Sequence, residues 1–273
     1  MHITKMHGLG NDFIVIEEKE LAGQDVCALA QKLCARRLNV GADGLLLVCG
    51  SDCADTRMRI INSDGSEAEM CGNGIRCFAR YVYDKGIVKK ECMEVETLAG
   101  VMKPELVLTG GVVTAVRVDM GKPSFDPAAI PVSVADPLDF TIETQSGTVR
   151  AASVLMGVPH TVVFVEDMDA APIDTLGPEI ERHALFPRRT NVDFIQILGD
   201  QTARMETWER GAGRTLACGT GATGAAVVMH RKGMMGPSAD IRLLAGTLHI
   251  DILPDGRAMM SGAAEYVLDG ETK

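Results

Sequence analysis

The sequence predicts an α/β (α+β) protein made of two halves that share one fold. Three observations predict it: short β-rich runs outnumber helical ones, the second half repeats motifs of the first, and prolines crowd near the middle. A chain of 273 residues is long enough for two domains, since about 150 residues is usual for one. Its residues are 46% hydrophobic but only 4% aromatic, so the cores must be aliphatic.

The expected strands are short apolar or β-branched runs bounded by Gly, Pro or Asp. In chain order they are Phe13–Ile16, Leu45–Val48, Met58–Ile61, Val112–Val118, Thr161–Val165, Phe194–Leu198 and Thr247–Ile252. Fewer segments predict helices. Residues 25–36 have helical periodicity, Pro178 suits the first turn of a helix reaching about Leu185, and the apolar stretches 75–83 and 222–230 each follow a glycine cluster.

A proline-rich segment separates the two halves. Residues 122–137 hold four of the eleven prolines, at positions 123, 127, 131 and 137. Proline at this density continues neither a helix nor a strand ladder. We therefore expect a domain junction near residues 118–122.

The two halves repeat each other at an offset of 147 residues. Without a gap, the offset aligns Arg57-Met58 with Arg204-Met205, Cys71-Gly72 with Cys218-Gly219, Gly74 with Gly221, and Ala79 with Ala226. A glycine-rich chain could repeat Cys-Gly-x-Gly by chance. The flanking matches share the same offset, however, and this favours a duplication.

Each copy of the repeated motif predicts a reactive thiol beside an anion site. The copies are Cys71-Gly72-Asn73-Gly74 and Cys218-Gly219-Thr220-Gly221, each expected in a loop between a strand and a helix. Glycine lets the backbone approach a ligand closely. The N–H groups and dipole at a helix start favour a carboxylate or phosphate, and they also favour the thiolate form of a cysteine.

Two such thiols suit inversion at a carbon next to a carboxylate. If the halves pack about a pseudo-two-fold axis, the motifs face each other across an interdomain cleft, which would be the active site. One thiolate removes the α-proton from one face, and the other group, as a thiol, delivers a proton to the opposite face. The helix N-termini stabilise the carbanion. We interpret the other six cysteines as small buried apolar residues: Cys27, Cys34, Cys49, Cys53, Cys77 and Cys92.

Composition and motifs exclude several other classes. The net charge of −10 argues against nucleic acid or an anionic membrane as a partner. The N-terminus has no secretory h-region, and no apolar run could span a bilayer, so we expect a cytoplasmic protein with reduced thiols. Cys49 and Cys53 form a single short-spaced pair without a second pair or a His cluster, so no metal site is predicted. The sequence contains no cofactor motif, and no cofactor is expected.

Three segments resemble the signatures of diaminopimelate epimerases. They are His7-Gly8-Leu9-Gly10-Asn11-Asp12-Phe13, the segment Asn62–Gly74 that ends in Met70-Cys71-Gly72-Asn73-Gly74, and the segment Glu209–Gly221 that contains Ala217-Cys218-Gly219-Thr220-Gly221. The resemblance spans nearly the whole chain. It implies a cofactor-independent isomerase that interconverts LL- and meso-diaminopimelate for lysine and peptidoglycan precursor synthesis.

The resemblance also implies an architecture. It predicts two pseudo-symmetric domains, each a mixed sheet wrapped round a central helix, with the C-terminal segment returning to the first domain. We accordingly expect one domain from residues 1–117 and 262–273 and the other from residues 118–261. It further implies a homodimer that acts on a small amino acid.

Site residues follow from the resemblance position by position. Cys71 and Cys218 match the acid/base pair, and His160 and Glu209 match the groups that tune them. Residues that match substrate-binding positions are Asn11, Asn62, Gly72, Asn73, Asn191, Arg210, Gly219 and Thr220. Two positions depart from the family pattern: Val158 stands where asparagine is typical, and Arg214 stands in an expected loop where glutamate is common.

Other functions remain open at this point. Val158 leaves room for a racemase of the same fold that acts on another amino acid. Cys71 and Cys218 could instead form a switchable disulfide in a redox-sensing or ligand-binding protein. A dinucleotide-binding oxidoreductase is disfavoured, because Gly211-Ala212-Gly213 lacks the third glycine of that fingerprint. The sequence also leaves open which thiol serves which stereoisomer.

Overall fold

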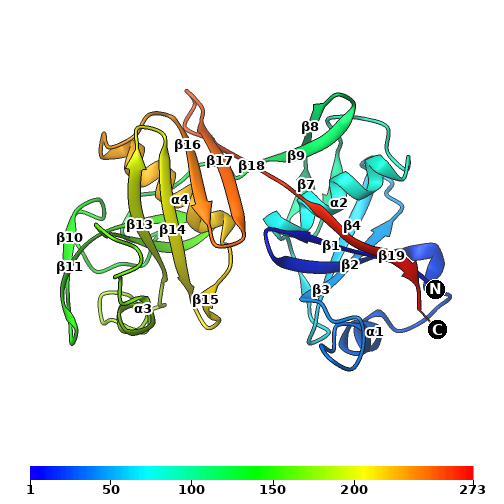
Figure 1. Cartoon of the computed structure of the whole chain (residues 1–273), viewed down its shortest axis with the longest axis horizontal. Coiled ribbons are helices and arrows are strands. Elements are labelled where there is room, and N and C mark those ends of the chain that lie inside the picture. The colour runs from blue at the N-terminus through cyan, green and yellow to red at the C-terminus, as the bar shows by residue number, and fades with distance from the viewer. Residues whose placement is uncertain (273) are drawn as a thin grey trace. The chain divides into compact units, whose positions relative to one another are not determined.

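The computed structural model describes residues 1–272, which form two compact units (Figure 1). Unit 1 comprises Met1–Val118 and the C-terminal segment that begins at Ser261, and unit 2 comprises Asp119–Met260. Each unit contains one mixed β-sheet, one helix buried against it and one shorter helix.

The sheet of unit 1 has the strand order β19-β1-β2-β3-β4-β6-β7, and β5 pairs with β4. The C-terminal strand β19 lies antiparallel to β1, so both ends of the chain belong to this unit (Figure 1). Strands β8 and β9 form an antiparallel hairpin. The bounds are β1 His2–Gly8, β2 Asn11–Glu17, β3 Gly44–Cys49, β4 Thr56–Asn62, β5 Glu67–Ala68, β6 Val95–Thr97, β7 Gly100–Met102, β8 Glu105–Thr109, β9 Val112–Asp119 and β19 Glu265–Glu271.

Helix α2 (Gly72–Asp84) is the central helix of unit 1. It packs against β1, β2, β3 and β4. Its residues 74–79 are all buried, including the whole of Arg76. The Arg76 guanidinium donates to the carbonyls of Gly72 (3.0 Å) and Ala263 (3.3 Å), so it ties the helix to the C-terminal segment.

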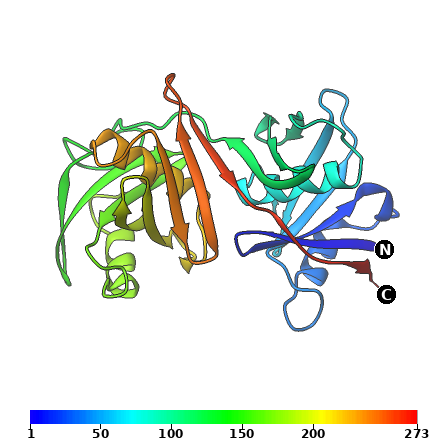
Figure 2. The same cartoon turned by 45° about the horizontal axis from the view of Figure 1, so that its top comes forward.

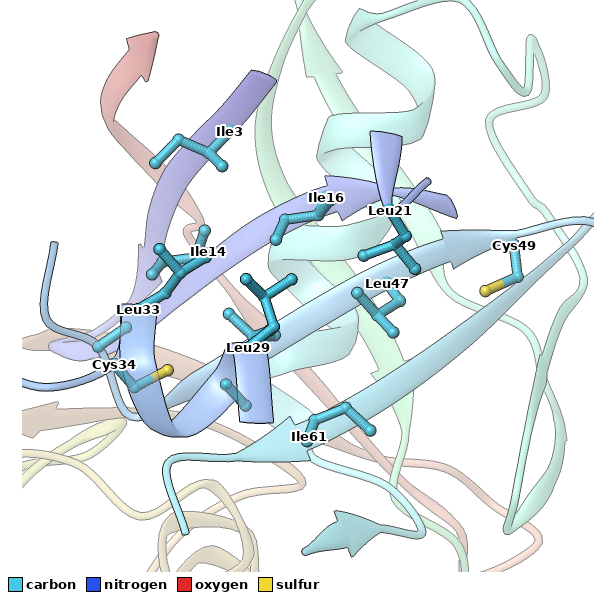
Figure 3. Packing of buried hydrophobic residues seen from close by; sticks show 13 residues of the cluster. Ile3, Ile14, Ile16, Leu21, Leu29, Leu33, Cys34, Leu47, Cys49 and Ile61 are labelled. Carbon is cyan, nitrogen blue, oxygen red and sulfur yellow. The ribbon is translucent and has the colours of Figure 1, made fainter. Parts of the chain in front are cut away.

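Helix α1 (Val26–Leu33) contributes to a second core in unit 1. The Asp25 side chain caps its N-terminus by accepting from the backbone N–H of Cys27 at 2.9 Å. Figure 3 shows Leu29 of α1 packed over Ile14 of β2 and Leu47 of β3. Since α2 packs on the same strands, every residue of β3 is buried, as in sheets that helices cover on both faces.

Unit 2 repeats this topology. Its strand order is β10-β11-β12-β13-β14-β16-β17, followed by β18, and β15 pairs with β14. The bounds are β10 Phe140–Thr144, β11 Gly147–Met156, β12 Val158–Phe164, β13 Asn191–Gly199, β14 Thr202–Glu209, β15 Gly213–Thr215, β16 Ser238–Leu243, β17 Gly246–Ile252, β18 Ala258–Gly262, α3 Ile173–Glu181 and α4 Gly219–Arg231.

Helix α4 is the central helix of unit 2 and lies against the strands of its own unit in both views (Figure 1, Figure 2). It contacts β11, β12, β13, β16 and β17, so the sheet wraps round it. Residues 221–229 are buried without interruption. A helix enclosed on all sides accounts for a run of small and aliphatic residues with little polar character.

The predicted duplication is confirmed at the level of single elements. Helix α2 starts at Gly72 and α4 at Gly219, which lies 147 residues later; α1 and α3 begin at Val26 and Ile173, the same distance apart. Strands β2 and β12 have the same offset and the same length. Each central helix therefore meets its sheet at equivalent positions in the two units.

Two expectations about the helices were wrong. Both central helices begin three residues earlier than the apolar stretches indicate, so Cys71 and Cys218 are N-cap residues and the glycines form the first helical turn. Helix α3 does not start near Pro178. It runs from Ile173 to Glu181 with Pro178 inside it, because the apolar face of the helix, which packs into the hydrophobic core of unit 2, begins at Ile173.

Gly44 provides a test of the close strand packing in unit 1. A Cβ at Gly44 would lie 2.7 Å from the backbone oxygen of Ile61 on β4, and a backbone atom in a ladder cannot move aside. Gly44→Ala is expected to lower the free energy of unfolding by about 1–3 kcal/mol, measured by urea denaturation. The control Gly50→Ala adds a Cβ to open space and should be neutral. Equal stability of the two variants would contradict the packing argument.

Candidate active site

The candidate site residues form one cluster in each unit, built around the cysteine that caps the central helix. In unit 1, Cys71 has extended backbone angles, and its sulfur accepts from the N–H of Gly74 at 3.5 Å. The N–H groups at the start of an α-helix have no partner within the helix. Gly72 and Asn73 therefore present a pair of such donors beside the thiol, which suits a carboxylate.

Asn11 lies next to Cys71 and Asn73. Its Oδ1 accepts from Asn73 Nδ2 at 3.2 Å and from the Cys71 thiol at 3.6 Å. Its Nδ2 donates to Asp43 Oδ2 at 2.7 Å. The contact with Asp43 fixes the orientation of the Asn11 amide, so that an oxygen faces the cysteine.

Asp43 belongs to a charged network that the sequence analysis missed. Arg36 Nη2 donates to Asp12 Oδ1 at 2.6 Å and to Asp43 Oδ1 at 2.8 Å, and Lys5 Nζ lies 2.9 Å from Asp12 Oδ2. Burial alone would raise the pKa of Asp12, but hydrogen bonds from Arg36 and Lys5 lower it. The only sequence signal for Asp43 is an acidic residue directly before a buried strand.

Asn62 ends β4 and lies opposite Gly44 in the ladder. Its side chain donates to Ser66 Oγ at 3.0 Å, and its backbone N–H donates to the carbonyl of Ser66 at 2.8 Å. Asn62 thus lies opposite Gly44, the residue after Asp43, and its amide nitrogen is hydrogen-bonded to the turn that leads to Cys71.

Arg76 is a second unit 1 residue that the sequence analysis missed. Its side chain is fully buried, and its Nη2 has no hydrogen-bond partner among residues 1–272. Burial lowers the pKa of Arg76, while the charges of Cys77 and Cys71 in their thiolate forms oppose this shift. The buried guanidinium therefore favours the thiolate form of Cys71.

In unit 2, a chain of contacts links Cys218 to a buried carboxylate. The Cys218 sulfur lies 3.4 Å from Thr220 Oγ1, which lies 3.0 Å from His160 Nε2. His160 Nδ1 lies 2.7 Å from Asp193 Oδ2. The side chains of His160 and Asp193 have no exposed surface. The structure therefore brings together Cys218, Thr220 and His160, which are three of the candidate site residues, and adds Asp193.

The strand register explains this cluster. Val162 on β12 pairs with Asp193 on β13, and Asp193 pairs with Thr207 on β14. Residues two apart on a strand share a face, so His160 lies on the same face as Asp193. The hydroxyl of Thr207 donates to Asp193 Oδ1 at 2.8 Å.

Glu209 shares that face, two residues beyond Thr207. The Thr215 hydroxyl donates to its Oε1 at 2.6 Å. Burial, with the negative charge of Asp193, raises the pKa of Glu209, against the opposing hydrogen bonds of Thr215 and Cys218. Burial also raises the pKa of the Cys218 thiol well above its ordinary value, and the charges of Glu209 and Asp193 add to this effect.

Asn191 and Arg210 are joined to each other. The Asn191 amide donates to the carbonyl of Pro159 at 3.1 Å and accepts from the backbone N–H of Arg210 at 2.8 Å. The exposed Arg210 side chain donates to the carbonyl of Arg188 at 2.9 Å. In this arrangement Asn191 links the backbone of Pro159, which precedes His160, to the backbone of Arg210. The guanidinium of Arg210 has N–H groups besides the one that bonds to Arg188.

The two departures from the family pattern occupy different settings. Val158 is the first residue of β12, two residues from His160. Arg214 lies in strand β15, contrary to the loop that we expected. It donates through Nε and Nη2 to the buried Glu206 and through Nη1 to Asp174. Glu206 alternates with Thr207 on β14, so Arg214 points to the opposite face from Asp193 and Glu209.

The interpretation of the remaining cysteines as buried was wrong for half of them. Cys34, Cys49 and Cys77 are buried, and burial raises the pKa of each, to about 12 for Cys77. Cys27, Cys53 and Cys92 are exposed, because they lie in the first turn of α1 and in two loop segments outside the cores.

Within residues 1–272, no group of three or more His, Cys, Asp or Glu side chains could hold a metal ion. The helices described over the same range are all too short or too polar to cross a membrane.

Comparison with solved structures identifies the fold. The chain matches a PhzF-family phenazine biosynthesis protein from Bacillus anthracis with a TM-score of 0.70 at 14% identity, covering 100% of this chain and 99% of that one. A hydroxyproline epimerase from Agrobacterium vitis gives a TM-score of 0.69 at 18% identity, with 99% and 91% covered. A probable proline racemase from Agrobacterium radiobacter K84 gives 0.69 at 16% identity, with 100% and 92% covered.

Sequence comparison is more specific. The chain is 52% identical over 275 residues to a diaminopimelate epimerase from Moorella thermoacetica, with 99% of both chains covered. It is 50% identical over 280 residues to one from Pelotomaculum thermopropionicum, with 99% and 98% covered. The family profile described as "Diaminopimelate epimerase" matches residues 3–125 and 152–267. The resemblance of the cysteine motifs is thereby confirmed, and the chain belongs to the diaminopimelate epimerase family.

Proposed function

We propose that this protein is an isomerase that interconverts LL- and meso-diaminopimelate by two-base proton transfer without a cofactor. The observation that carries the proposal is that each unit places a cysteine at the N-cap of its central helix, at the same position of a duplicated fold. Membership of the family and 52% identity to a relative of that name support the substrate.

Cys71 and Cys218 are the proposed acid/base pair, and both act on one α-carbon. One sulfur, as thiolate, removes the α-proton. The other, as thiol, gives a proton to the opposite face, and the roles exchange in the reverse direction. The first-turn N–H groups of Gly72, Asn73, Gly219 and Thr220 would bind the α-carboxylate, where negative charge grows as the proton leaves.

The remaining site residues have two proposed roles. His160 and Glu209 tune the protonation of Cys218, to which the first is linked through Thr220 and the second by a hydrogen bond. Asn11, Asn62, Asn191 and Arg210 would bind the distal ammonium and carboxylate of the substrate. Amides can serve as donor or acceptor, and the guanidinium of Arg210 can fork onto a carboxylate.

A second candidate substrate is another amino acid, because Val158 lacks the amide that is typical of the family. A panel of amino acids incubated with the enzyme in deuterated water distinguishes the two. Deuterium should enter at the α-carbon of diaminopimelate. Exchange on another amino acid, with none on diaminopimelate, would reject the proposed substrate and leave the two-base chemistry in place.

We further propose a cytoplasmic homodimer that serves lysine and peptidoglycan precursor synthesis. Strand β19 is at the edge of its sheet and exposes Tyr266, Val267 and Leu268. An apolar edge strand of this kind favours association with a second chain. Light scattering during size-exclusion chromatography should give twice the mass of 29.2 kDa, and a mass of one chain at all concentrations would contradict the dimer.

Substitution of either proposed catalytic cysteine tests the mechanism. Cys71→Ala and Cys218→Ala are each expected to lower the rate of epimerisation by roughly 10²-fold or more, because each removes a proton donor or acceptor. The rate is followed by the appearance of meso product from the LL isomer. Cys53→Ala, at an exposed site, is the matched control and should keep full activity. Normal turnover by either catalytic variant would rule out the two-base mechanism.

Glu209→Gln tests the electrostatics around Cys218. Because the carboxylate charge raises the pKa of the Cys218 thiol, its removal should lower that pKa and increase the thiolate fraction at a given pH. The rate of Cys218 alkylation by iodoacetamide at pH 8 should rise several-fold, measured by peptide mass spectrometry with Cys71 as an internal reference. The control Glu179→Gln removes an exposed carboxylate that bonds to Ser146 and should leave the rate unchanged. A slower reaction in Glu209→Gln would mean that Glu209 instead withdraws the thiol proton.

A further inference from the structure

A continuous series of polar contacts runs from the thiol of Cys218 into the core of unit 2. The steps are 3.4 Å from Cys218 Sγ to Thr220 Oγ1, 3.0 Å from Thr220 Oγ1 to His160 Nε2, and 2.7 Å from His160 Nδ1 to Asp193 Oδ2. Each step is within hydrogen-bonding range. Each of the two middle groups can accept a proton on one side and donate one on the other.

We propose that Asp193 is a positioning residue for the acid/base chemistry of Cys218, acting through His160 and Thr220. Asp193 accepts from His160 Nδ1–H and so keeps Nε2 as the acceptor that faces Thr220. Thr220 connects this nitrogen to the sulfur. The inference rests on the proposed role of Cys218 and adds a residue to the machinery that sets its protonation.

The proton transfer balances without any further reactant. When Cys218 ionises, the S–H bond breaks and its proton passes to Thr220 Oγ1, while the hydroxyl proton of Thr220 passes to His160 Nε2. The products are a thiolate and an imidazolium, with Asp193 adjacent to the new positive charge. The reverse transfer restores the thiol. One proton moves in each direction and no electron is transferred.

The equivalent positions of unit 1 show that the fold itself does not need these polar groups. At the offset of 147 residues, His160 corresponds to Phe13, Asp193 to Leu46 and Thr207 to Ile60. All three unit 1 residues are buried. Leu46 and Phe13 approach Gly74 of α2, and Asp193 approaches Gly221 of α4 in the same way. Unit 2 thus has a buried carboxylate, Asp193, at the position where unit 1 has a buried leucine, Leu46.

Burial of the Asp193 side chain lowers the stability of the fold, so a purely structural role does not explain this residue. A carboxylate without exposed surface is destabilising unless it is paired. Among the ion pairs of residues 1–272, no lysine or arginine reaches Asp193, and its partners are His160 and the hydroxyl of Thr207. A Cβ at Gly221 would lie 2.5 Å from Asp193 Oδ1, so residue 221 must be glycine to make room for the carboxylate.

The groups around Cys218 explain why the thiol needs His160 and Asp193 nearby. Burial and the charge of Glu209 hold the Cys218 thiol protonated. Such a thiol serves as an acid readily but needs a proton acceptor to become a base. The Glu209 carboxylate already hydrogen-bonds to the thiol. His160, held by Asp193, supplies a second acceptor whose protonated form, unlike that of Glu209, is a cation that attracts the thiolate.

Asp193→Asn tests the proposal with little change in shape. The amide can donate to His160 Nδ1, which would place the ring proton on Nε2 and remove the acceptor that faces Thr220. The kcat for epimerisation is expected to fall by roughly 10²- to 10⁴-fold, with KM changed less than about threefold. The control Glu206→Gln alters a buried carboxylate on the opposite face of β14 and should leave kcat within about threefold.

The tautomer of His160 gives a readout that does not depend on activity. With ¹⁵N-histidine labelling, the His160 signals, assigned from a His160→Gln sample, should show a protonated Nδ1 in the wild type and a protonated Nε2 in Asp193→Asn. An unchanged tautomer would overturn the proposal. A changed tautomer with normal kcat would also overturn it, because the pair would then not serve Cys218.

Thr220 provides a second test if Asp193→Asn does not fold. Thr220→Val keeps the shape but removes the connecting hydroxyl and should lower kcat about as much as Asp193→Asn, whereas Thr220→Ser should restore most of it. Equal kcat for the two variants would contradict the relay. Failure of the proposed function is a separate result: it would appear as normal turnover by Cys218→Ala, while inactive Cys218→Ala with normal Asp193→Asn would reject only this inference.

Discussion

The first turn of each central helix lies close to its sheet, and at Gly221 of unit 2 the space is too small for any side chain. A Cβ at Gly221 would lie 2.5 Å from Asp193, and one at Gly74 would lie 3.2 Å from Leu46. This contact sets the place at which helix and sheet meet, and with it the position of the N-cap cysteine. Gly221, and to a lesser degree Gly74, is therefore a packing requirement as well as a means to expose N–H donors.

The residues that face the start of the central helix differ in charge between the two units. In unit 1 the helix start faces Phe13 and Leu46, and the buried cation of Arg76 interacts with Cys71. In unit 2 the helix start faces His160 and Asp193, with Glu209 on the same face. The charge of Arg76 therefore acts on Cys71 in the direction of the thiolate, whereas burial and the charges of Glu209 and Asp193 raise the pKa of the Cys218 thiol. The two cysteines of the duplicated fold thus lie in different electrostatic surroundings.

Residues around each cysteine are held by groups that lie further from it. Asp43 orients Asn11 in unit 1, and Asn191 ties Pro159 to Arg210 in unit 2. These contacts leave little freedom to the polar atoms that face the sulfur. Rigid support of this kind preserves the geometry that proton transfer requires, since small displacements are costly in rate. Arg214, by contrast, completes a charge network with Glu206 on the other face of β14.

The sequence by itself determined the duplication, the paired cysteines and the family, because repeats and short glycine motifs are local patterns that survive without knowledge of the fold. It also predicted seven strands and the approximate helices, but it placed the helix starts three residues late, since glycine is disfavoured in helices unless packing demands it. Only the tertiary structure revealed Asp43, Arg76 and Asp193. Asp43 and Asp193 each have a partner on a neighbouring strand, and Arg76 bonds to Ala263, which is distant in sequence. Strand register, which brings residues 160, 193 and 207 onto one face, is decided by long-range pairing that no local pattern encodes.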